Sequence, residues 1–370
     1  MDTAVAVVKC TSYDYAEVEA SLRKQIEALE GIPAIFEPDT QVLLKINLLS
    51  GAKPEKVICT HPVVVEALAN ILLEKGASVI IGDSPAGTFS KEKLEQAYRI
   101  SGMQGVAERT GAKLNYDLTS KMVKLTGGRT VAIWQQALAA NFVISVAKLK
   151  THALMTYTGA VKNMFGIIPG LSKAELHMLC PSKEAFANFL ADLYATLPPD
   201  FAVIDGIWGM EGDGPANGKL RKAGVLIAAV NGAVADLAAC QLIGIDPLQV
   251  PLLKELQRRK LCPEDVEDLE WLCEEEKDFS IRPFKLPASS SKYWRFLIPK
   301  KLWRMMEKVP VVNKEKCVSC QECYKICPAH TISMVENKAQ VGHKNCIACY
   351  CCHEVCAFDA IELKTRILAK

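Results

Sequence analysis

The feature that constrains this chain most is a group of nine cysteines between Cys317 and Cys356. The first four follow the pattern C-x2-C-x2-C-x3-C-P, and a second run with the same cysteine spacing begins 29 residues later, at Cys346. Three closely spaced thiolates can bind three irons of one cubane, whereas a fourth cysteine followed by proline is turned toward the neighbouring cubane. The two runs therefore predict two 4Fe-4S clusters that exchange their fourth ligands.

This exchange assigns eight of the nine cysteines to a ligand set. The predicted sets are Cys317, Cys320, Cys323 and Cys356 for one cluster, and Cys346, Cys349, Cys352 and Cys327 for the other. A structural zinc site would use four ligands from two C-x-x-C pairs and would leave the other cysteines unexplained. Cys351 is out of register, so we expect a buried thiol beside a cluster instead of a ligand. Roughly residues 311 to 364 resemble a bacterial-type two-cluster ferredoxin domain, with Ala357 where the first run has proline.

The rest of the chain has the composition of an ordinary globular protein. Half of its 370 residues are apolar, and 44 Lys and Arg balance 42 Asp and Glu, so no overall field favours nucleic acid. The N-terminus lacks a signal-peptide pattern, and cysteine-rich chains in a reducing compartment use thiolates for metal or redox work, so we expect a cytoplasmic protein. Residues 223–245 are apolar but are interrupted by Asn231-Gly232, which predicts a buried strand and helix and no membrane span.

Short β-branched runs alternate with helix-length amphipathic runs as far as residue 260. Strands are expected at residues 4–8, 42–46, 78–82, 142–146, 201–205 and 225–229. Helices are expected over residues 63–75 and 183–197, with Pro62 and Pro181-Ser182 as start signals. This alternation predicts an α/β fold with a mostly parallel sheet and helices on both faces, followed by a small α+β two-cluster ferredoxin domain.

The predicted domains are an α/β domain over residues 1–262, a linker and docking segment over 263–310, and the ferredoxin domain over 311–370. Residues 264–278 carry nine acidic side chains, and residues 292–308 carry six basic ones together with Trp294 and Trp303. We expect these aromatic side chains to pack the ferredoxin domain onto the α/β domain. A membrane-surface anchor is the alternative for this segment.

Polar side chains follow several of the predicted strands. They are Lys45, Asn47, Asp83, Ser84, Lys148, Lys150 and His152. In parallel sheets, ligands bind outside the carboxyl ends of the strands, so these residues predict a binding crevice there. Its lysines would neutralise carboxylate or phosphate oxygens. Solvated loop residues are the alternative.

Two later segments extend the predicted crevice. They contribute Lys162, Asn163 and His177, and the glycine-rich loop with Gly212, Asp213 and Gly214. The glycines would let the backbone approach a ligand closely, although a merely flexible loop is the alternative. For catalysis we expect His152 or His177 to exchange a proton, and Asp213 to bind a cation or orient the lysines. No nicotinamide or P-loop nucleotide motif is present.

The segments KLKTHALMTYTGAVKNMFGIIPG, DGIWGMEGDGPANG and VADLAACQLIGIDP, with KIN and GDSP upstream, resemble the domain of unknown function 362 family over roughly residues 3 to 260. That family is often fused to a ferredoxin domain, and the resemblance implies an iron-sulfur protein of anaerobic metabolism without an agreed substrate. The family's motif positions correspond in this chain to Lys148, Lys150, His152, Lys162, Asn163 and the loop from Gly212 to Pro215.

These features together favour an oxidoreductase. In this hypothesis the two clusters pass electrons between an electron donor or acceptor protein and a small anionic substrate in the crevice. The alternatives are a non-catalytic electron-transfer module that docks a partner protein, and a redox sensor.

Overall fold

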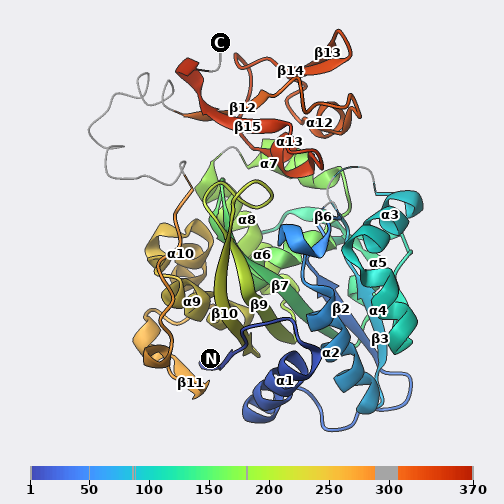
Figure 1. Ribbon diagram of the computed structural model, residues 1–370, viewed down its shortest axis with the longest axis vertical. Helices are drawn as coiled ribbons and strands as arrows, with labels where there is room; N and C mark the ends of the chain where they lie inside the picture. The colour runs from blue at the N-terminus through green and yellow to red at the C-terminus, as the bar shows by residue number, and fades with distance from the viewer. Residues whose placement is uncertain are drawn as a thin grey trace.

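The computed structural model describes residues 2–49, 51–85, 87, 89–180, 182–287 and 307–368. Figure 1 shows a large α/β part and a smaller C-terminal part, drawn in orange and red, at one end of it. The basic and aromatic portion of the predicted docking segment, including Trp294 and Trp303, lies outside the described residues, so its packing stays a prediction. The boundaries at residues 262 and 310 stay predictions.

A nine-stranded sheet forms the centre of the α/β part. Its strands are β1 (Ala4–Lys9), β2 (Gln41–Ile46), β3 (Ser78–Gly82), β4 (Lys113–Leu114), β7 (Phe142–His152), β8 (Thr156–Thr158), β9 (Phe201–Glu211), β10 (Lys219–Ala229) and β11 (Glu270–Cys273). The order is β11-β1-β10-β9-β7-β2-β3-β4, with β8 paired to β7. Strands β9, β7, β2, β3 and β4 are parallel, and β10 is antiparallel to both of its neighbours. The predicted fold class and all six predicted strands are confirmed.

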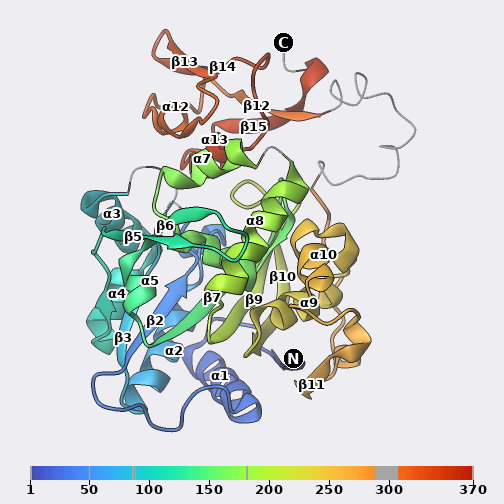
Figure 2. The same cartoon turned by 180° about the vertical axis from the view of Figure 1, so that it is seen from behind.

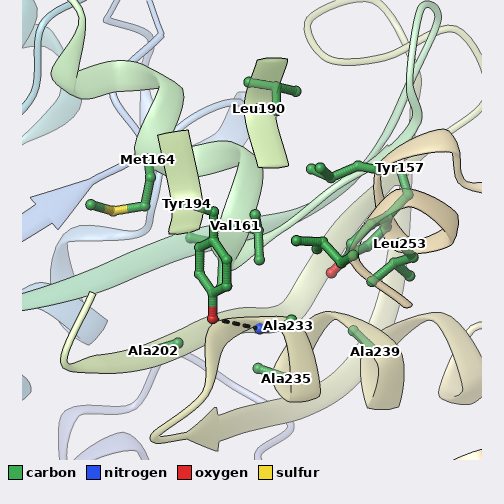
Figure 3. Packing of buried hydrophobic residues seen from close by; sticks show 14 of the residues in the cluster. Tyr157, Val161, Met164, Leu190, Tyr194, Ala202, Ala233, Ala235, Ala239 and Leu253 are labelled. Carbon is green, nitrogen blue, oxygen red and sulfur yellow. Dashed lines mark hydrogen bonds between the residues drawn. The ribbon is translucent and has the colours of Figure 1, made fainter. Parts of the chain in front are cut away.

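Helices cover both faces of this sheet (Figures 1 and 2). They are α1 (Tyr15–Leu29), α2 (Pro62–Glu74), α3 (Lys91–Ser101), α4 (Met103–Thr110), α5 (Gln135–Ala139), α6 (Ala160–Asn163), α7 (Ser172–Leu179), α8 (Lys183–Thr196), α9 (Gly232–Leu242) and α10 (Pro251–Arg258). Alternate residues of a strand point to opposite faces. Accordingly Leu43 packs with α8, α9 and α10, whereas Leu44 packs with α1 and α2. Figure 3 shows part of the first of these two cores, where the Tyr194 hydroxyl accepts the Ala233 N–H.

The helix start signals work as the sequence predicts. Pro62 is the first residue of α2, and the side chain of His61 caps it by accepting the Val63 N–H. Ser182 caps α8 through the Ala185 N–H. The structure adds a hairpin of β5 (Ser120–Lys124) and β6 (Thr130–Trp134). Three of the predicted strands are longer than expected: β7 continues to His152, and β9 and β10 form a long hairpin. None of the described helices has the length and apolarity needed to cross a membrane.

In the C-terminal part, the two cysteine runs that share a sequence pattern also share a local backbone conformation. Strand β12 (Lys308–Val312) pairs with β15 (Ile361–Thr365), and β13 (Ile332–Val335) pairs with β14 (Lys338–Val341). The short helices α12 (Glu322–Ile326) and α13 (Cys351–Val355) each follow a residue with positive φ, Gln321 in one run and Tyr350 in the other. The duplicated cysteine runs therefore have matching local conformations.

Helix α6 begins at Ala160 because a carboxylate from α9 binds its first N–H groups. Asp236 Oδ1 accepts the Ala160 N–H at 2.6 Å, and Oδ2 accepts the Val161 N–H at 3.0 Å. Only 2% of Asp236 is exposed. These bonds fix the position of Lys162 and Asn163, which α6 carries.

Replacing Asp236 with alanine should lower the free energy of unfolding by about 2–6 kcal/mol, because two buried N–H groups lose their acceptor at a cost of about 1–3 kcal/mol each. Denaturant unfolding followed by circular dichroism under anaerobic conditions measures this change. Asp246→Ala is the matched control, since Asp246 accepts the Leu248 N–H in an exposed turn and its loss should cost about 1 kcal/mol or less. Equal losses in the two variants would contradict this role of Asp236.

Candidate functional site

Two small cavities in the C-terminal part collect the cysteines of the repeat. One, of about 20 Å³, is lined by Cys317, Cys320, Cys323 and Cys356. The other, of about 10 Å³, is lined by Cys327, Cys346, Cys349 and Cys352. The structure thus brings together the same two sets that the spacing predicts, with the fourth cysteine of each run beside the other run. We call them the outer and the inner cysteine site, because Cys320 of the first is exposed and Cys352 of the second is buried.

The donor groups around both cysteine sites fit a 4Fe-4S cluster. Cys327 Sγ accepts the Thr331 N–H at 3.3 Å, and Cys356 Sγ accepts the Ala360 N–H at 3.3 Å. Amide hydrogen bonds of this kind stabilise ligand sulfurs and help to set a cluster's potential. The remaining lining is mainly apolar, which limits the access of water. Cys351, the residue out of register, lines neither cavity.

Ligand exchange between the runs can be tested with pairs of cysteine-to-alanine variants. Cys327 and Cys349 are predicted to bind the same cluster, so Cys327→Ala/Cys349→Ala should keep about four irons per chain, as should Cys349→Ala alone. Cys327→Ala/Cys320→Ala should lose almost all of its iron, because each substitution removes a ligand from a different cluster. Iron analysis after anaerobic purification gives the answer. If instead Cys327→Ala/Cys320→Ala keeps about four irons per chain and Cys327→Ala/Cys349→Ala loses almost all of its iron, each run binds its own cluster.

The predicted strand-end residues of the α/β part do converge. Strands β9, β7, β2 and β3 are parallel neighbours, so their carboxyl ends share one edge of the sheet. Lys148 Nζ lies 2.8 Å from Asp205 Oδ2, and Lys45 Nζ lies 2.9 Å from Asp83 Oδ1. All four side chains are at most 4% exposed. The lysines are therefore paired inside the protein across adjacent strands.

Lys150 also has protein partners. Its Nζ donates to Asn47 Oδ1 and to Ile58 O, both at 2.6 Å. Burial lowers the pKa of Lys150 to about 7, and it also lowers the pKa of Lys45 and Lys148. Lys45, Lys148 and Lys150 are not among the residues that line the largest cavity found within the described residues, so we interpret them as a buried support under the crevice.

A larger cavity, of about 70 Å³, lies between the two parts of the chain. Its lining comes from both parts: Asn47, Leu49, Asp83, Ser84, Thr158, Lys162, Asn163, Phe165, Gly166, Lys173, Ala174, His177, Ile326, Cys351 and Glu354. We call it the interdomain cavity. Cys351 and Ile326 each adjoin a cysteine of the inner site in sequence, so this cavity and that site share a wall. The volume suits a small molecule and not a dinucleotide.

The cationic groups of the interdomain cavity are Lys162 and Lys173. Within the described residues, neither forms an ion pair with an acidic side chain, although Lys173 donates to Ser84 O and Lys162 lies over the Phe165 ring. Burial lowers the pKa of Lys173 to about 7 and also lowers that of Lys162. The neighbouring His177 packs against aromatic rings, and burial lowers its pKa to about 4, so its imidazole is neutral near pH 7.

An acidic residue of the ferredoxin part completes the cavity. Glu354 on α13 reaches the end of β7, where its Oε1 lies 3.2 Å from His152 Nε2. His152 Nδ1 accepts the N–H groups of Leu154 and Met155, so the imidazole proton is on Nε2 and faces Glu354. Burial lowers the pKa of His152 to about 4. His152 does not line the cavity, and its geometry makes it a support for Glu354.

The glycine-rich loop has a different place from the one that the sequence suggests. Gly212, Asp213 and Gly214 do not line the interdomain cavity. A Cβ at Gly214 would lie 2.3 Å from Thr151 O, so this glycine permits close packing against β7 and not the approach of a ligand. The loop contacts the ferredoxin part, where Asn217 Nδ2 lies 2.9 Å from His353 Nε2.

Sequence reasoning missed the two charged residues Lys173 and Glu354 among those that line the cavity. Lys173 stands four residues before His177 on α7, so helical spacing could have placed it on the same face. Glu354 lies between two predicted cluster ligands, and only the packing of the two parts brings it to the crevice. Asn47, Asp83, Ser84, Lys162, Asn163 and His177 are the predicted site residues that line the cavity.

The fold and the cysteine sites define an α/β protein with an iron-sulfur electron-transfer module. Residues 309–357 match the 4Fe-4S dicluster domain, which confirms the iron-sulfur prediction, and residues 42–241 match the domain of unknown function 362. The chain belongs to the domain of unknown function 362 family, as its sequence motifs indicate. The number of clusters and their individual ligands stay predictions.

Comparisons with whole proteins add little about activity. A thylakoid-associated protein of Synechocystis sp. is 32% identical over 299 residues, which cover 78% of this chain and 88% of that protein. The lactate racemase apoprotein from Thermoanaerobacterium thermosaccharolyticum aligns with a TM-score of 0.40 and 14% identity, over 65% of this chain and 56% of that one. A Thermotoga maritima protein aligns with a TM-score of 0.35 and 12% identity, over 55% and 52%. The chain thus spans about half the length of these two structures. Its cytoplasmic location stays a prediction.

Proposed function

We propose that the protein is an iron-sulfur oxidoreductase whose substrate is a small anion bound in the interdomain cavity. The observation that supports this most is the shared wall: Cys351 and Ile326, beside the inner cysteine site, face the same cavity as Lys162 and Lys173. When bound, the 4Fe-4S clusters would supply electrons one at a time, and an external redox protein would exchange electrons at the outer site, where Cys320 is exposed.

The cavity residues would bind the anion by charge and by hydrogen bonds. Lys162 and Lys173 are the cations of the wall without acidic partners among the described residues, and their partial burial strengthens their attraction for an anion. Asn47, Asn163 and Ser84 add polar groups, while Phe165 and Leu49 exclude water. In this proposal Lys162 and Lys173 bind the anion. Lys148 and Lys150, which the sequence predicted as binding residues, instead support the crevice from below.

Lys173 is the best proton donor in the cavity. Reducing a carbonyl to an alcohol takes two electrons and two protons, so the site must deliver protons as well as exchange electrons. A general acid works best when its pKa is close to the working pH, and burial lowers the pKa of Lys173 to about 7. His177, with a pKa of about 4, is neutral near pH 7 and would relay protons from solvent instead of storing them.

Stopped-flow reoxidation of the reduced protein tests this proposal. The probes are glyoxylate, pyruvate, acrylate and crotonate, added anaerobically while the cluster absorbance is followed. At least one should reoxidise the protein, and Lys162→Met or Lys173→Met should slow that reaction by roughly tenfold or more, since one unit charge near a partly buried anion contributes at least about 1.4 kcal/mol.

The matched control is Lys91→Met, which removes an equal charge from an exposed position away from the cavity and should leave the rate unchanged. If no probe reoxidises the parent faster than it reoxidises the two cavity variants, the protein is an electron carrier for a partner protein. The exposed Cys320 favours that second function.

A further inference from the structure

The charge balance of the interdomain cavity limits what it can bind. Asp83 lines the wall, but its carboxylate is already saturated: Oδ1 pairs with Lys45 at 2.9 Å and accepts the Ser84 N–H at 2.8 Å, and Oδ2 accepts the Leu48 N–H at 2.9 Å. The charges left are two lysines, Lys162 and Lys173, and one carboxylate, Glu354. When both lysines are protonated, they leave an excess of one positive charge, which one negative charge on a ligand balances.

Glu354 also provides an acceptor for a ligand. Its Oε1 is buried 3.2 Å from the Nε2 of His152, whereas no hydrogen bond within the described residues reaches the second oxygen, Oε2. The side chain is 13% exposed, and the residue lines the interdomain cavity, so part of the carboxylate is open to it. A buried acceptor without a donor costs about 1–3 kcal/mol, and more when it is charged, so a ligand that carries a donor gains by satisfying it.

We infer that Glu354 is a specificity-determining residue that selects small monoanions bearing a hydroxyl donor, such as hydroxy monocarboxylates. The ligand's carboxylate binds on the side of Lys162 and Lys173, and its hydroxyl donates to Glu354. A carboxylate without a hydroxyl leaves Glu354 unsatisfied, and a dianion places its second charge near Glu354. This inference rests on the proposed function, because it takes the interdomain cavity as the substrate site.

Anaerobic isothermal titration calorimetry with acetate, glycolate and malonate tests the selection directly. Glycolate differs from acetate only by a hydroxyl, and malonate adds a second charge to a similarly small frame. The dissociation constant of glycolate should be roughly tenfold lower than that of acetate, because a hydrogen bond to a charged group contributes about 1.5–3 kcal/mol. Malonate should bind more weakly than glycolate.

Two variants assign this preference to Glu354. Glu354→Gln should reduce the preference for glycolate over acetate to about twofold or less and should tighten the binding of malonate. The matched control, Glu362→Gln, changes an exposed carboxylate of the same domain that is paired with Lys364, and it should keep the order of the parent. Iron content and the visible spectrum show whether each variant has assembled its clusters.

The outcomes separate this inference from the proposed function. If glycolate and acetate bind the parent equally well and Lys162→Met weakens both, the selection by Glu354 is wrong while the anion site stands. If none of the three anions binds the parent, both the inference and the anion site fail. Should Glu354→Gln fail to assemble its clusters, the order of affinities in the parent decides alone.

Discussion

The ion pairs between adjacent strand ends are the interaction on which the rest of this structure depends. A charged lysine inside a protein is costly unless a carboxylate and further hydrogen bonds accompany it. Lys148 meets Asp205 across β7 and β9, and Lys45 meets Asp83 between β2 and the chain that follows β3. Each pair therefore requires its two strands to be parallel neighbours in this register.

A layer of buried and mostly neutralised charge thus forms the floor of the crevice. The lysines Lys162 and Lys173, which line the interdomain cavity, form no ion pair with an acidic side chain among those described, and our proposal takes this difference as the basis of anion binding. The same low dielectric that makes the floor costly strengthens the attraction of these two lysines for an anion.

The ferredoxin part is more than an attached electron carrier, because it forms one wall of the cavity. Helix α13 carries Cys351 and Cys352 of the repeat and presents Glu354 to the end of β7. Asn217 of the glycine-rich loop contacts His353 of the same helix and donates to Ile361 O at 3.1 Å. A ligand in the cavity would therefore touch both parts, and two of the lining residues, Ile326 and Cys351, pack in one cluster with Cys327 and Cys352 of the inner cysteine site.

The sequence alone predicted those features that depend on local spacing. Cysteine spacing led to both cysteine sites, including the placement of Cys327 and Cys356, since a turn of fixed geometry follows each third cysteine. Strand ends led to the convergence of Lys45, Lys148 and Asp83, because parallel strands share a carboxyl edge. Which lysines are paired and which face the cavity could not be predicted, because each outcome depends on a partner far away in the chain. Glu354 belongs to the other domain, and only the packing of the two parts places it at the crevice.

The central claim is that a small anion binds beside the inner cysteine site. Electron paramagnetic resonance of two reduced single-cluster variants tests it most directly. Cys320→Ala should keep the cluster of the inner site, and Cys349→Ala should keep that of the outer site. The account predicts that saturating glycolate changes the spectrum of Cys320→Ala and leaves that of Cys349→Ala unchanged. Equal changes in both variants, or a change in Cys349→Ala alone, would contradict it.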